Sequence, residues 1–308
     1  HWINQGFLSL RNIEELVKLN KPIVWTMHDM WPCTGICHHA RDCEKFQTGC
    51  GACFFLKSEG KDLSTSVFDK KLSLYKDANI TFVGCSRWLS DRARKSYLLQ
   101  EKAVLSIPNP INMEVYHPMD QNMPRGLLGL PSGKKLLLFG ALNVTDKRKG
   151  IDFLIEALRK LEKQDVELVV FGQVKDDIRG LFPVPIHSMG YLSDESKIVA
   201  LYNAVDMFIT SSLEENLPNT IMESMACGTP CVGFATGGIP EMIDHRVNGY
   251  VANYKDAGDL ACGIRWVLEH EDRQALSDAC VKKVRDNYTE EVVAKQYTAL
   301  YEKLLKGE

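Results

Sequence analysis

An α/β fold built on parallel, doubly wound sheets is the fold class that this sequence predicts, and three observations support it. Short apolar segments of strand length alternate with helix-like segments, above all from Lys134 onward. At 308 residues the chain is long for one such domain, so two domains are expected. Turns rich in glycine or basic residues follow several of the strands, where open α/β sheets bind their ligands.

The first part of the chain, residues 1–118, predicts the back half of a Rossmann-like domain. The chain opens with His1-Trp-Ile-Asn-Gln5 instead of methionine, in what resembles a strand leading into a helix, so we expect the natural start to be missing and this domain to be incomplete. Strands are expected at 21–27 and 80–84, and helices at 12–19 and 90–98.

The second part, residues 119–288, predicts another Rossmann-like domain. Three prolines in 107–118 and the loose composition of 119–131 indicate the connection between the domains. The helix from Ile151 has apolar residues at i, i+3, i+4, i+7 and i+10, a stripe suited to cover a sheet. A last helix, 289–308, is expected to fold back towards the first domain. Strands are expected at 135–139, 166–171, 184–188, 206–209 and 230–234.

Composition argues against two classes of partner. The 37 basic and 40 acidic residues form no basic stripe, so we expect no nucleic-acid partner. No segment reaches the roughly 18–20 apolar residues that cross a bilayer, and the amino terminus lacks the form of a signal peptide. We therefore expect a cytoplasmic protein. Peripheral association with the inner face of the membrane stays open, although no amphipathic basic helix argues for it.

The stretch Ser212–Val232 places two carboxylates, Glu215 and Glu223, around the start of a helix. Pro218 suits the first turn of that helix, and Gly228 ends it. Backbone N–H groups at a helix start carry partial positive charge, so a diphosphate is a suitable ligand there. On spacing alone, helix capping and a solvated helix face are the commoner explanation of such a pair.

Two further turns favour ligand binding. After the strand that ends near Phe139, Gly140 forms a turn and Lys147, Arg148 and Lys149 approach the edge of the sheet, where they suit an anion. The Gly-Gly turn in 236–241 follows another strand and allows close approach of a ligand. Either turn alone is common loop chemistry. Together with the helix start after Pro218, they predict a diphosphate pocket.

These motifs together resemble those of the retaining glycosyltransferases of family 4, which have the GT-B fold of two Rossmann-like domains. The likeness covers nearly the whole chain. The segment His28-Asp-Met-Trp-Pro32 and the cysteines after it resemble those of bacterial transferases that build exopolysaccharide or surface glycans. The matching residues are Glu215 and Glu223 of the Glu-x7-Glu motif, Gly140, Lys149-Gly150, the turn 237–241, 107–109 and 26–28.

The resemblance implies a hexosyltransferase that moves a sugar, with retention of configuration, from a nucleoside diphosphate-sugar to a glycan or lipid-linked acceptor. No metal or other cofactor would be needed for catalysis. Glu215 would contact the donor sugar, Lys149 would neutralise the leaving diphosphate, and His28 would lie near the reacting sugar as the third catalytic residue. Glu223 would hold the ribose hydroxyls. The other substrate-binding residues would be Gly140, Arg148, Asn216, Leu217, Pro218, Asn219, Thr220 and, near the donor base or sugar, Tyr191.

One departure from the family pattern affects the phosphate loop. The family usually has an arginine shortly after the glycine, whereas Ala141 follows Gly140 here, and we expect Arg148 to take its place. Two alternatives remain open, a GT-B nucleotide-sugar epimerase and a non-catalytic module that binds a sugar nucleotide or zinc. The donor sugar, its base and the acceptor cannot be read from the residues.

The cysteines give a second signal, because five of the ten lie between Cys33 and Cys53. The last two belong to a Cys-Gly-Ala-Cys sequence like that of a zinc knuckle. In a reducing cytosol disulfides are disfavoured, so we expect structural zinc, with His38 and His39 as alternative ligands. An oxidising compartment would reverse that preference. The expected ligands are Cys37, Cys43, Cys50 and Cys53.

Overall fold

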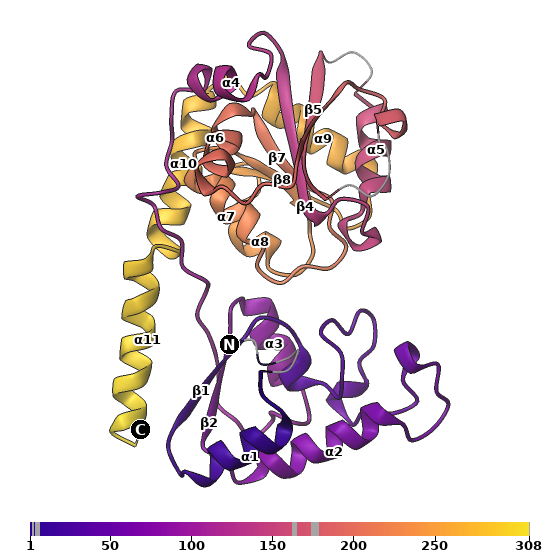
Figure 1. Cartoon of the computed structure of the whole chain (residues 1–308), viewed down its shortest axis with the longest axis vertical. Coiled ribbons are helices and arrows are strands. Elements are labelled where there is room, and N and C mark those ends of the chain that lie inside the picture. Colours follow the sequence, from indigo (N-terminus) through magenta and orange to yellow (C-terminus); the bar gives the residue numbers. More distant parts are fainter. Residues whose placement is uncertain (2, 4–6, 162–164, 174–178, 308) are drawn as a thin grey trace. The chain divides into compact units, whose positions relative to one another are not determined.

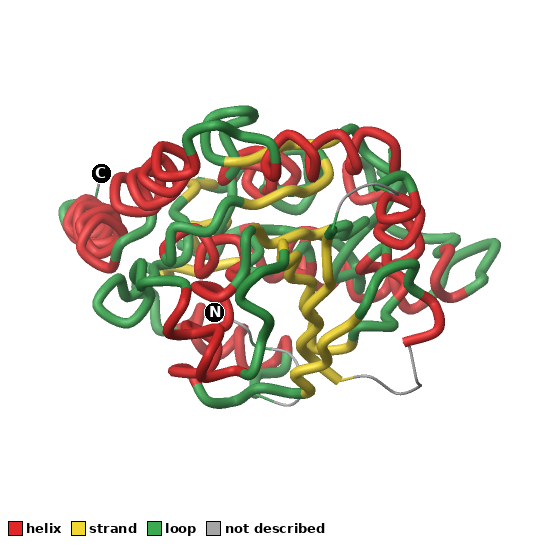
Figure 2. Tube along the Cα trace, turned by 90° about the horizontal axis from the view of Figure 1, so that it is seen from above, coloured by secondary structure: helices red, strands yellow, loops and turns green. Residues whose placement is uncertain are grey.

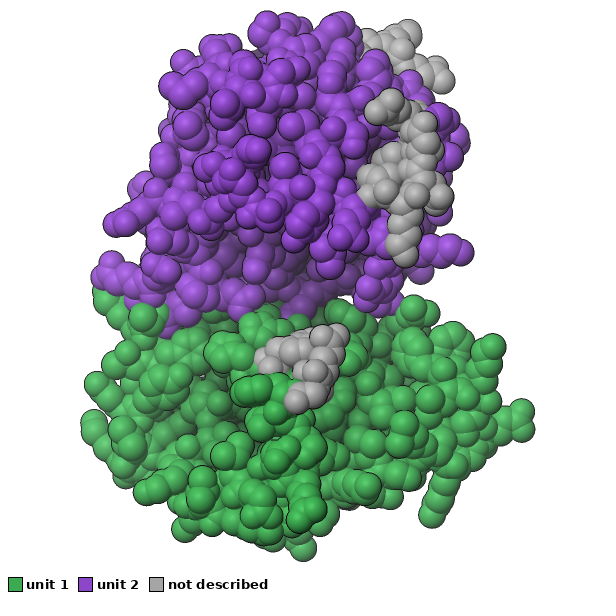
Figure 3. Space-filling view, in the orientation of Figure 1, with its two compact units in different colours: residues 1–108, 294–308 green, residues 109–293 purple. Residues whose placement is uncertain are grey.

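The computed structural model describes the chain except for residues 2, 4–6, 162–164, 174–178 and 308. It divides into two compact units (Figure 3). Unit 1 comprises residues 1–108 and 294–308, and unit 2 comprises residues 109–293. Each unit contains one parallel sheet, so the predicted α/β class is confirmed.

The sheet of unit 1 has its strands in the order β1-β2-β3, all parallel. Phe82 and Val83 in the central strand are fully buried. The long connection from β1 to α2 contains the cysteine-rich segment and three short 3-10 turns. The elements are β1 (Ile23–Met27), β2 (Ile80–Gly84), β3 (Val104–Ser106), α1 (Leu10–Lys18), α2 (Leu63–Lys76) and α3 (Arg87–Arg94) (Figure 1).

The sheet of unit 2 is parallel, with the strand order β6-β5-β4-β7-β8-β9. The order along the sheet reverses between β4 and β7, which makes a topological switch point at their carboxyl ends. Leu136, Leu137 and Leu138 are fully buried, as expected for a strand covered on both faces. The strands are β4 (Lys135–Asn143), β5 (Val166–Gln173), β6 (Ile186–Gly190), β7 (Met207–Thr210), β8 (Cys231–Phe234) and β9 (Gly249–Ala252).

Helices lie on both sides of this sheet (Figures 1 and 2). On one face α5 packs with α9, and its stripe of Leu154, Ile155 and Leu158 is buried as the periodicity predicts. The other face carries α6 and α7. The helices of unit 2 are α4 (Asn122–Leu128), α5 (Ile151–Arg159), α6 (Glu195–Ala204), α7 (Asn219–Ala226), α8 (Ile239–Met242), α9 (Ala257–Leu268) and α10 (Arg273–Asn287).

The segment 107–131 differs from the loose connection that its prolines indicate. Residues 109–118 group with unit 2, where the Ile111 N–H donates to the Tyr288 carbonyl at 2.8 Å. Farther on, α4 forms despite Pro124, because a proline in the first turn of a helix removes no intrahelical hydrogen bond. Arg125 of this helix is buried. This stretch is therefore a packed part of unit 2.

The last helix, α11 (Glu290–Leu305), begins in unit 2, and its residues from Ala294 onward group with unit 1. The hydroxyls of Tyr297 and of Thr26 in β1 lie 3.0 Å apart and share a hydrogen bond. Leu300 is buried on the same helix. The carboxyl-terminal end of the chain is thus attached to the first sheet, beside the strand that leads to His28.

Candidate functional site

Two loops meet at the switch point of unit 2, one after β4 and one after β7. The Leu213 N–H donates to the Arg148 carbonyl at 2.7 Å, and the Ser211 hydroxyl donates to the Lys149 carbonyl at 2.9 Å. Gly150 allows this approach, because a Cβ there would lie 2.0 Å from the Ser211 carbonyl oxygen. The backbone around Lys149 is therefore fixed against the segment that leads to Glu215.

The side chains of Lys149 and Glu215 form an ion pair across these loops. The Ser212 hydroxyl donates to the same Glu215 oxygen at 2.9 Å. The Lys149 side chain is 30% exposed and that of Glu215 15% exposed, so the pair is partly shielded and still reachable from solvent. Two of the three residues predicted to be catalytic thus come together, although 66 positions separate them.

A third loop, after β8, closes on the same place. The Gly238 N–H donates to the Asn216 carbonyl at 2.6 Å, and the Thr236 hydroxyl donates to the Leu213 carbonyl at 3.3 Å. Gly237 has φ +56°, and a Cβ on it would lie 1.8 Å from the Glu215 carbonyl oxygen. The predicted Gly-Gly turn is therefore a contact between two loop backbones.

Replacing Gly237 with alanine is expected to destabilise unit 2 by roughly 2–5 kcal/mol, from left-handed strain together with overpacking. Gly129→Ala is the matched control, since Gly129 has φ +64° and open space where a Cβ would stand. Its expected cost is about 1–2 kcal/mol, from strain alone. Denaturant unfolding of both variants measures the difference. Equal losses in the free energy of unfolding would show that the close approach of the loops at Gly237 and Glu215 does not affect stability.

Helix α7 starts directly after these loops. Pro218 is its N-cap residue, and the helix ends at Cys227 and Gly228, as the sequence predicts. Leu217 is buried with its neighbour Asn216, whereas Asn219 is exposed and accepts a hydrogen bond from the Asn109 side chain at 3.2 Å. Thr220 is half-buried in the first turn. The segment 216–220 therefore lies between the Lys149–Glu215 pair and Glu223.

Glu223 lies on α7, one turn beyond the helix start, and is partly buried. Burial raises the pKa of its carboxyl group, while a hydrogen bond from Tyr202 lowers it. That hydrogen bond runs from the Tyr202 hydroxyl to Glu223 Oε2 at 2.9 Å. Tyr202 is a site neighbour that the sequence did not reveal, since nothing in a single chain links a tyrosine of α6 to a glutamate of α7.

Three other predicted residues lie at the carboxyl edge of the same sheet or next to it. Gly140 is needed for packing, because a Cβ there would lie 1.9 Å from the Phe171 ring. Arg148 is 53% exposed and pairs with Asp146, through Nη2 at 2.7 Å and Nε at 3.1 Å, and this bonding lowers the pKa of Asp146. Tyr191 follows β6 and is 59% exposed.

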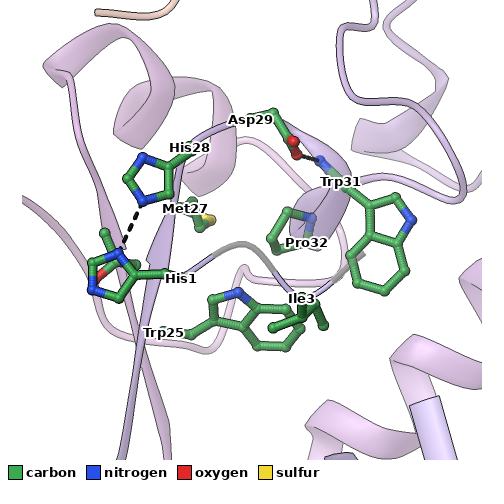
Figure 4. A pocket seen from close by; sticks show the side chains of 9 residues that line it. His1, Ile3, Trp25, Met27, His28, Asp29, Trp31 and Pro32 are labelled. Carbon is green, nitrogen blue, oxygen red and sulfur yellow. Dashed lines mark hydrogen bonds between the residues drawn. The ribbon is translucent and has the colours of Figure 1, made fainter. Parts of the chain in front are cut away.

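His28 lies in unit 1, at the end of β1, beside a small pocket (Figure 4). Its Nε2 is 3.0 Å from Nδ1 of His1, and burial lowers its pKa. The next residue, Asp29, is buried and accepts the Trp31 N–H at 2.7 Å and a bond from His38 Nδ1 at 2.8 Å. The turn that presents His28 is therefore tied to the cysteine-rich segment.

The cysteine-rich segment contains free thiols. The Gly35 N–H points to Cys50 Sγ at 3.2 Å, and burial, with the three neighbouring thiols Cys53, Cys50 and Cys43, raises the pKa of Cys37 to about 12. The described residues contain no group of three or more His, Cys, Asp or Glu side chains that could hold a metal ion as they stand. The zinc site stays a prediction.

The side chain of Lys71 in α2 packs against the start of this segment and donates hydrogen bonds to its backbone. It is fully buried, lies 3.4 Å from the centre of the Trp31 ring and donates to the carbonyls of Thr34 and Gly35 at 2.9 and 3.1 Å. Burial lowers its pKa to about 7. A buried amino group that donates to several backbone carbonyls fixes the path of the chain between β1 and the cysteines.

No helix in the described part of the chain is both long enough and apolar enough to cross a membrane.

Comparison with known proteins identifies the domain that carries this site. Residues 133–270 match the model of the family described as Glycosyl transferases group 1. This part of the chain is thus similar to a glycosyltransferase group 1 domain, and the matched range contains the Lys149–Glu215 pair and Glu223.

Curated relatives and solved structures extend the likeness. The chain is 24% identical over 213 residues to N-acetyl-alpha-D-glucosaminyl L-malate synthase of Bacillus anthracis, covering 67% of this chain and 55% of that protein. It is 32% identical over 194 residues to the N,N'-diacetylbacillosaminyl-diphospho-undecaprenol alpha-1,3-N-acetylgalactosaminyltransferase of Campylobacter jejuni subsp. jejuni, covering 57% and 50%. The chain spans about half the length of the curated relatives it matches.

The fold is similar to that of Anabaena HepE in complex with UDP, with a TM-score of 0.75 and 16% identity over 96% of this chain and 77% of that one. At this identity the likeness concerns the fold alone. Together with the two parallel sheets, it shows that the chain has the GT-B fold.

Proposed function

We propose that this protein is a retaining glycosyltransferase that transfers a sugar from a nucleoside diphosphate-sugar to a glycan or lipid-linked acceptor in surface polysaccharide synthesis, on the cytoplasmic side of the membrane. The observation that carries the proposal is the Lys149–Glu215 pair at the switch point, directly before the start of α7. HepE was crystallised with UDP, and the Campylobacter relative is named for a diphospho-undecaprenol acceptor, which supports this choice of substrates.

In the proposed reaction the anomeric carbon of the donor sugar loses its bond to the diphosphate oxygen and gains a bond to an acceptor hydroxyl oxygen. That hydroxyl gives up its proton, which the oxygen of the leaving diphosphate accepts. Negative charge grows on the leaving diphosphate while the sugar becomes oxocarbenium-like, so a fixed cation beside the diphosphate lowers the barrier. Lys149 would supply that cation, and Arg148 would assist. No metal ion is required for this neutralisation.

The remaining roles follow the positions of the side chains. Glu215 would bind hydroxyls of the donor sugar while its bonds to Lys149 and Ser212 keep it oriented. The backbone of 216–220 would contact the sugar and phosphates, and Glu223 would accept the ribose hydroxyls. Tyr191 would lie beside the base, and His28 would act on the reacting sugar.

Incubation with a panel of UDP-, GDP- and ADP-sugars tests this function. Slow release of free nucleoside diphosphate by hydrolysis is the expected result for a transferase without its acceptor. An isomerised sugar would instead identify an epimerase, and a thermal shift without any product would identify a binding module. Retention is then tested by NMR analysis of the anomeric configuration of the product, once an acceptor is found.

Arg148→Ala tests the role of this arginine at the phosphates. If Arg148 leaves Asp146 to contact the diphosphate, its loss should weaken nucleoside diphosphate binding by roughly ten- to a hundredfold, the range for a charged hydrogen bond. Asp146→Asn is the matched variant, because it removes the negative charge that holds Arg148 without removing Arg148 itself, and it should bind at least as tightly as the native protein. Unchanged affinity and turnover in Arg148→Ala would show that Arg148 does not take the place of the arginine that the family usually has in the phosphate loop.

We also propose that Cys37, Cys43, Cys50 and Cys53 hold a structural zinc ion. Burial raises the pKa of Cys50, and the Gly35 N–H at its Sγ opposes this effect. Bound zinc would favour the thiolates, and the amino group of buried Lys71 would offset part of their negative charge. The ion would have to draw the four thiols together. Elemental analysis of reductively purified protein should find about one zinc per chain. Cys50→Ser should lose it and Cys262→Ser, at an exposed cysteine, should keep it; a native protein without zinc would refute the site.

A further inference from the structure

The surroundings of Glu223 contain one side chain whose placement packing alone does not explain. Tyr202 of α6 is 1% exposed, and its hydroxyl donates to Glu223 Oε2 at 2.9 Å. A phenylalanine would fill the same volume without bringing a polar group into the interior. The hydroxyl therefore contributes its hydrogen bond to this carboxylate and not only volume to the core.

The ring of Tyr202 is held from several directions. It meets Phe171 and Phe208 edge-on, with centroids 6.2 and 6.0 Å apart. Its carbonyl accepts the Thr229 hydroxyl at 2.8 Å. With backbone and ring both fixed, the hydroxyl points to one place. A hydrogen bond from such a group restricts how the carboxylate of Glu223 can turn.

We infer that Tyr202 is a positioning residue for nucleotide binding, which orients the Glu223 carboxylate so that it accepts the ribose hydroxyls of the donor. The inference rests on the proposed function. A carboxylate that binds a diol must be ionised and must present its free lone pairs at a set angle. Tyr202 occupies a lone pair of Oε2 and leaves Oε1 to the ligand.

The electrostatic surroundings of Glu223 give the Tyr202 hydroxyl a second effect. Burial and the charge of Glu195 favour the protonated form of Glu223, and the Tyr202 hydroxyl opposes them. Glu195 and Tyr202 face the carboxylate from α6, Tyr116 from the segment before α4, and Cys227 from the end of α7. Tyr202 is the side chain among these whose hydrogen bond lowers the pKa of Glu223.

The test compares two ligands by calorimetry: the nucleoside diphosphate that binds best among UDP, GDP and ADP, and its 2′,3′-dideoxy form. The native protein should prefer the ribose form, and Glu223→Gln should abolish most of that preference. Tyr202→Phe keeps the ring and should reduce the preference about five- to tenfold. In the double variant the two losses should not add, because both act on one contact.

Tyr250→Phe is the matched control. Tyr250 is also buried in unit 2, and its hydroxyl donates to a carboxylate, Asp259 Oδ1, at 2.7 Å. This variant should lose stability without losing preference for the ribose form. A pH series gives a second readout that loss of packing would not move. Affinity falls as Glu223 becomes protonated at low pH, and Tyr202→Phe should move the midpoint to higher pH, because the pKa of Glu223 rises without its donor.

Two results would overturn the inference in distinguishable ways. If Glu223→Gln loses the preference while Tyr202→Phe keeps both the preference and the native pH midpoint, Tyr202 is only a packing residue and the proposed function stands. If no nucleoside diphosphate binds, or Glu223→Gln keeps the full preference, the ribose role within the proposed function fails and the inference fails with it.

Discussion

Replacing Lys149 with alanine is expected to lower hydrolytic turnover of the nucleotide-sugar donor about 10²–10³-fold, the range found when one electrostatic contact to a developing charge is removed. The structure gives the reason. The Lys149 backbone is clamped by Ser211, and its ammonium group is held by Glu215, so the charge is in place before the substrate arrives. Such a preorganised charge costs no rearrangement at the moment of reaction.

The loss should appear mainly in kcat, since the negative charge on the diphosphate grows in the transition state. Lys160→Ala is the control, because Lys160 ends α5 and pairs with Glu156 away from these loops. Lys149→Arg should recover part of the activity. If turnover in Lys149→Ala stays within about threefold of native, Lys149 does not neutralise the leaving diphosphate, and the proposed mechanism loses its main support.

Replacing Arg125 with methionine is expected to destabilise unit 2 by about 3–5 kcal/mol, the cost of breaking a buried ion pair by removing one partner. Arg125 is 4% exposed and donates to Asp206 Oδ2 at 2.9 Å and to the Ala204 carbonyl at 2.7 Å. It also donates to the carbonyls of Ser132 and Lys134 at 3.1 and 3.0 Å. Methionine would fill space but remove all four of these hydrogen bonds from the interior.

Hydrogen exchange followed by mass spectrometry measures this effect unit by unit, which suits a chain whose two units need not unfold together. Peptides from β4 and β7 should exchange faster in Arg125→Met, and peptides from β2 should not. Arg285→Met changes an exposed arginine on α10 and should leave both sets unaltered. A loss under about 1 kcal/mol would mean that the remaining bond from Arg273 to Asp206, at 2.8 Å, is sufficient.

Helices and strands could be predicted where one face of the element, or both of its faces, are buried along its whole length. The apolar run at β4 and the stripe of α5 follow directly from periodicity. Pro124 and Gly126 indicate a break where α4 forms, because the bonds that hold this helix run from Arg125 to residues distant in sequence, Ala204 and Asp206, and no local pattern reveals them. Strand β9, four residues long, is too short for its periodicity to be recognised.

The site was predictable to the extent that residues carry a motif. Lys149 and Glu215 were named from their motifs, and the parallel topology brings them together at adjacent strand ends. The sequence does not predict which residues form hydrogen bonds with the side chains of the candidate site. Tyr202 bonds to Glu223 of another helix, so this pairing depends on tertiary packing. Ser212 bonds to Glu215 three residues on, and Asp146 binds Arg148 two residues on, but a serine or an aspartate in a loop has many local partners and the sequence does not say which one it takes.

If the proposed function holds, the contacts between the glycine loops limit how this domain can change the donor that it binds. At Gly150 and Gly237 a Cβ would run into the backbone of the neighbouring loop, so the three loops share one arrangement and none can be lengthened or redirected alone. Altered specificity should therefore come from exchange of side chains on an unchanged frame, at exposed positions such as Asn219 and Tyr191. A library directed at those two positions should yield folded proteins with new donor preferences, whereas loop insertions should yield unstable ones.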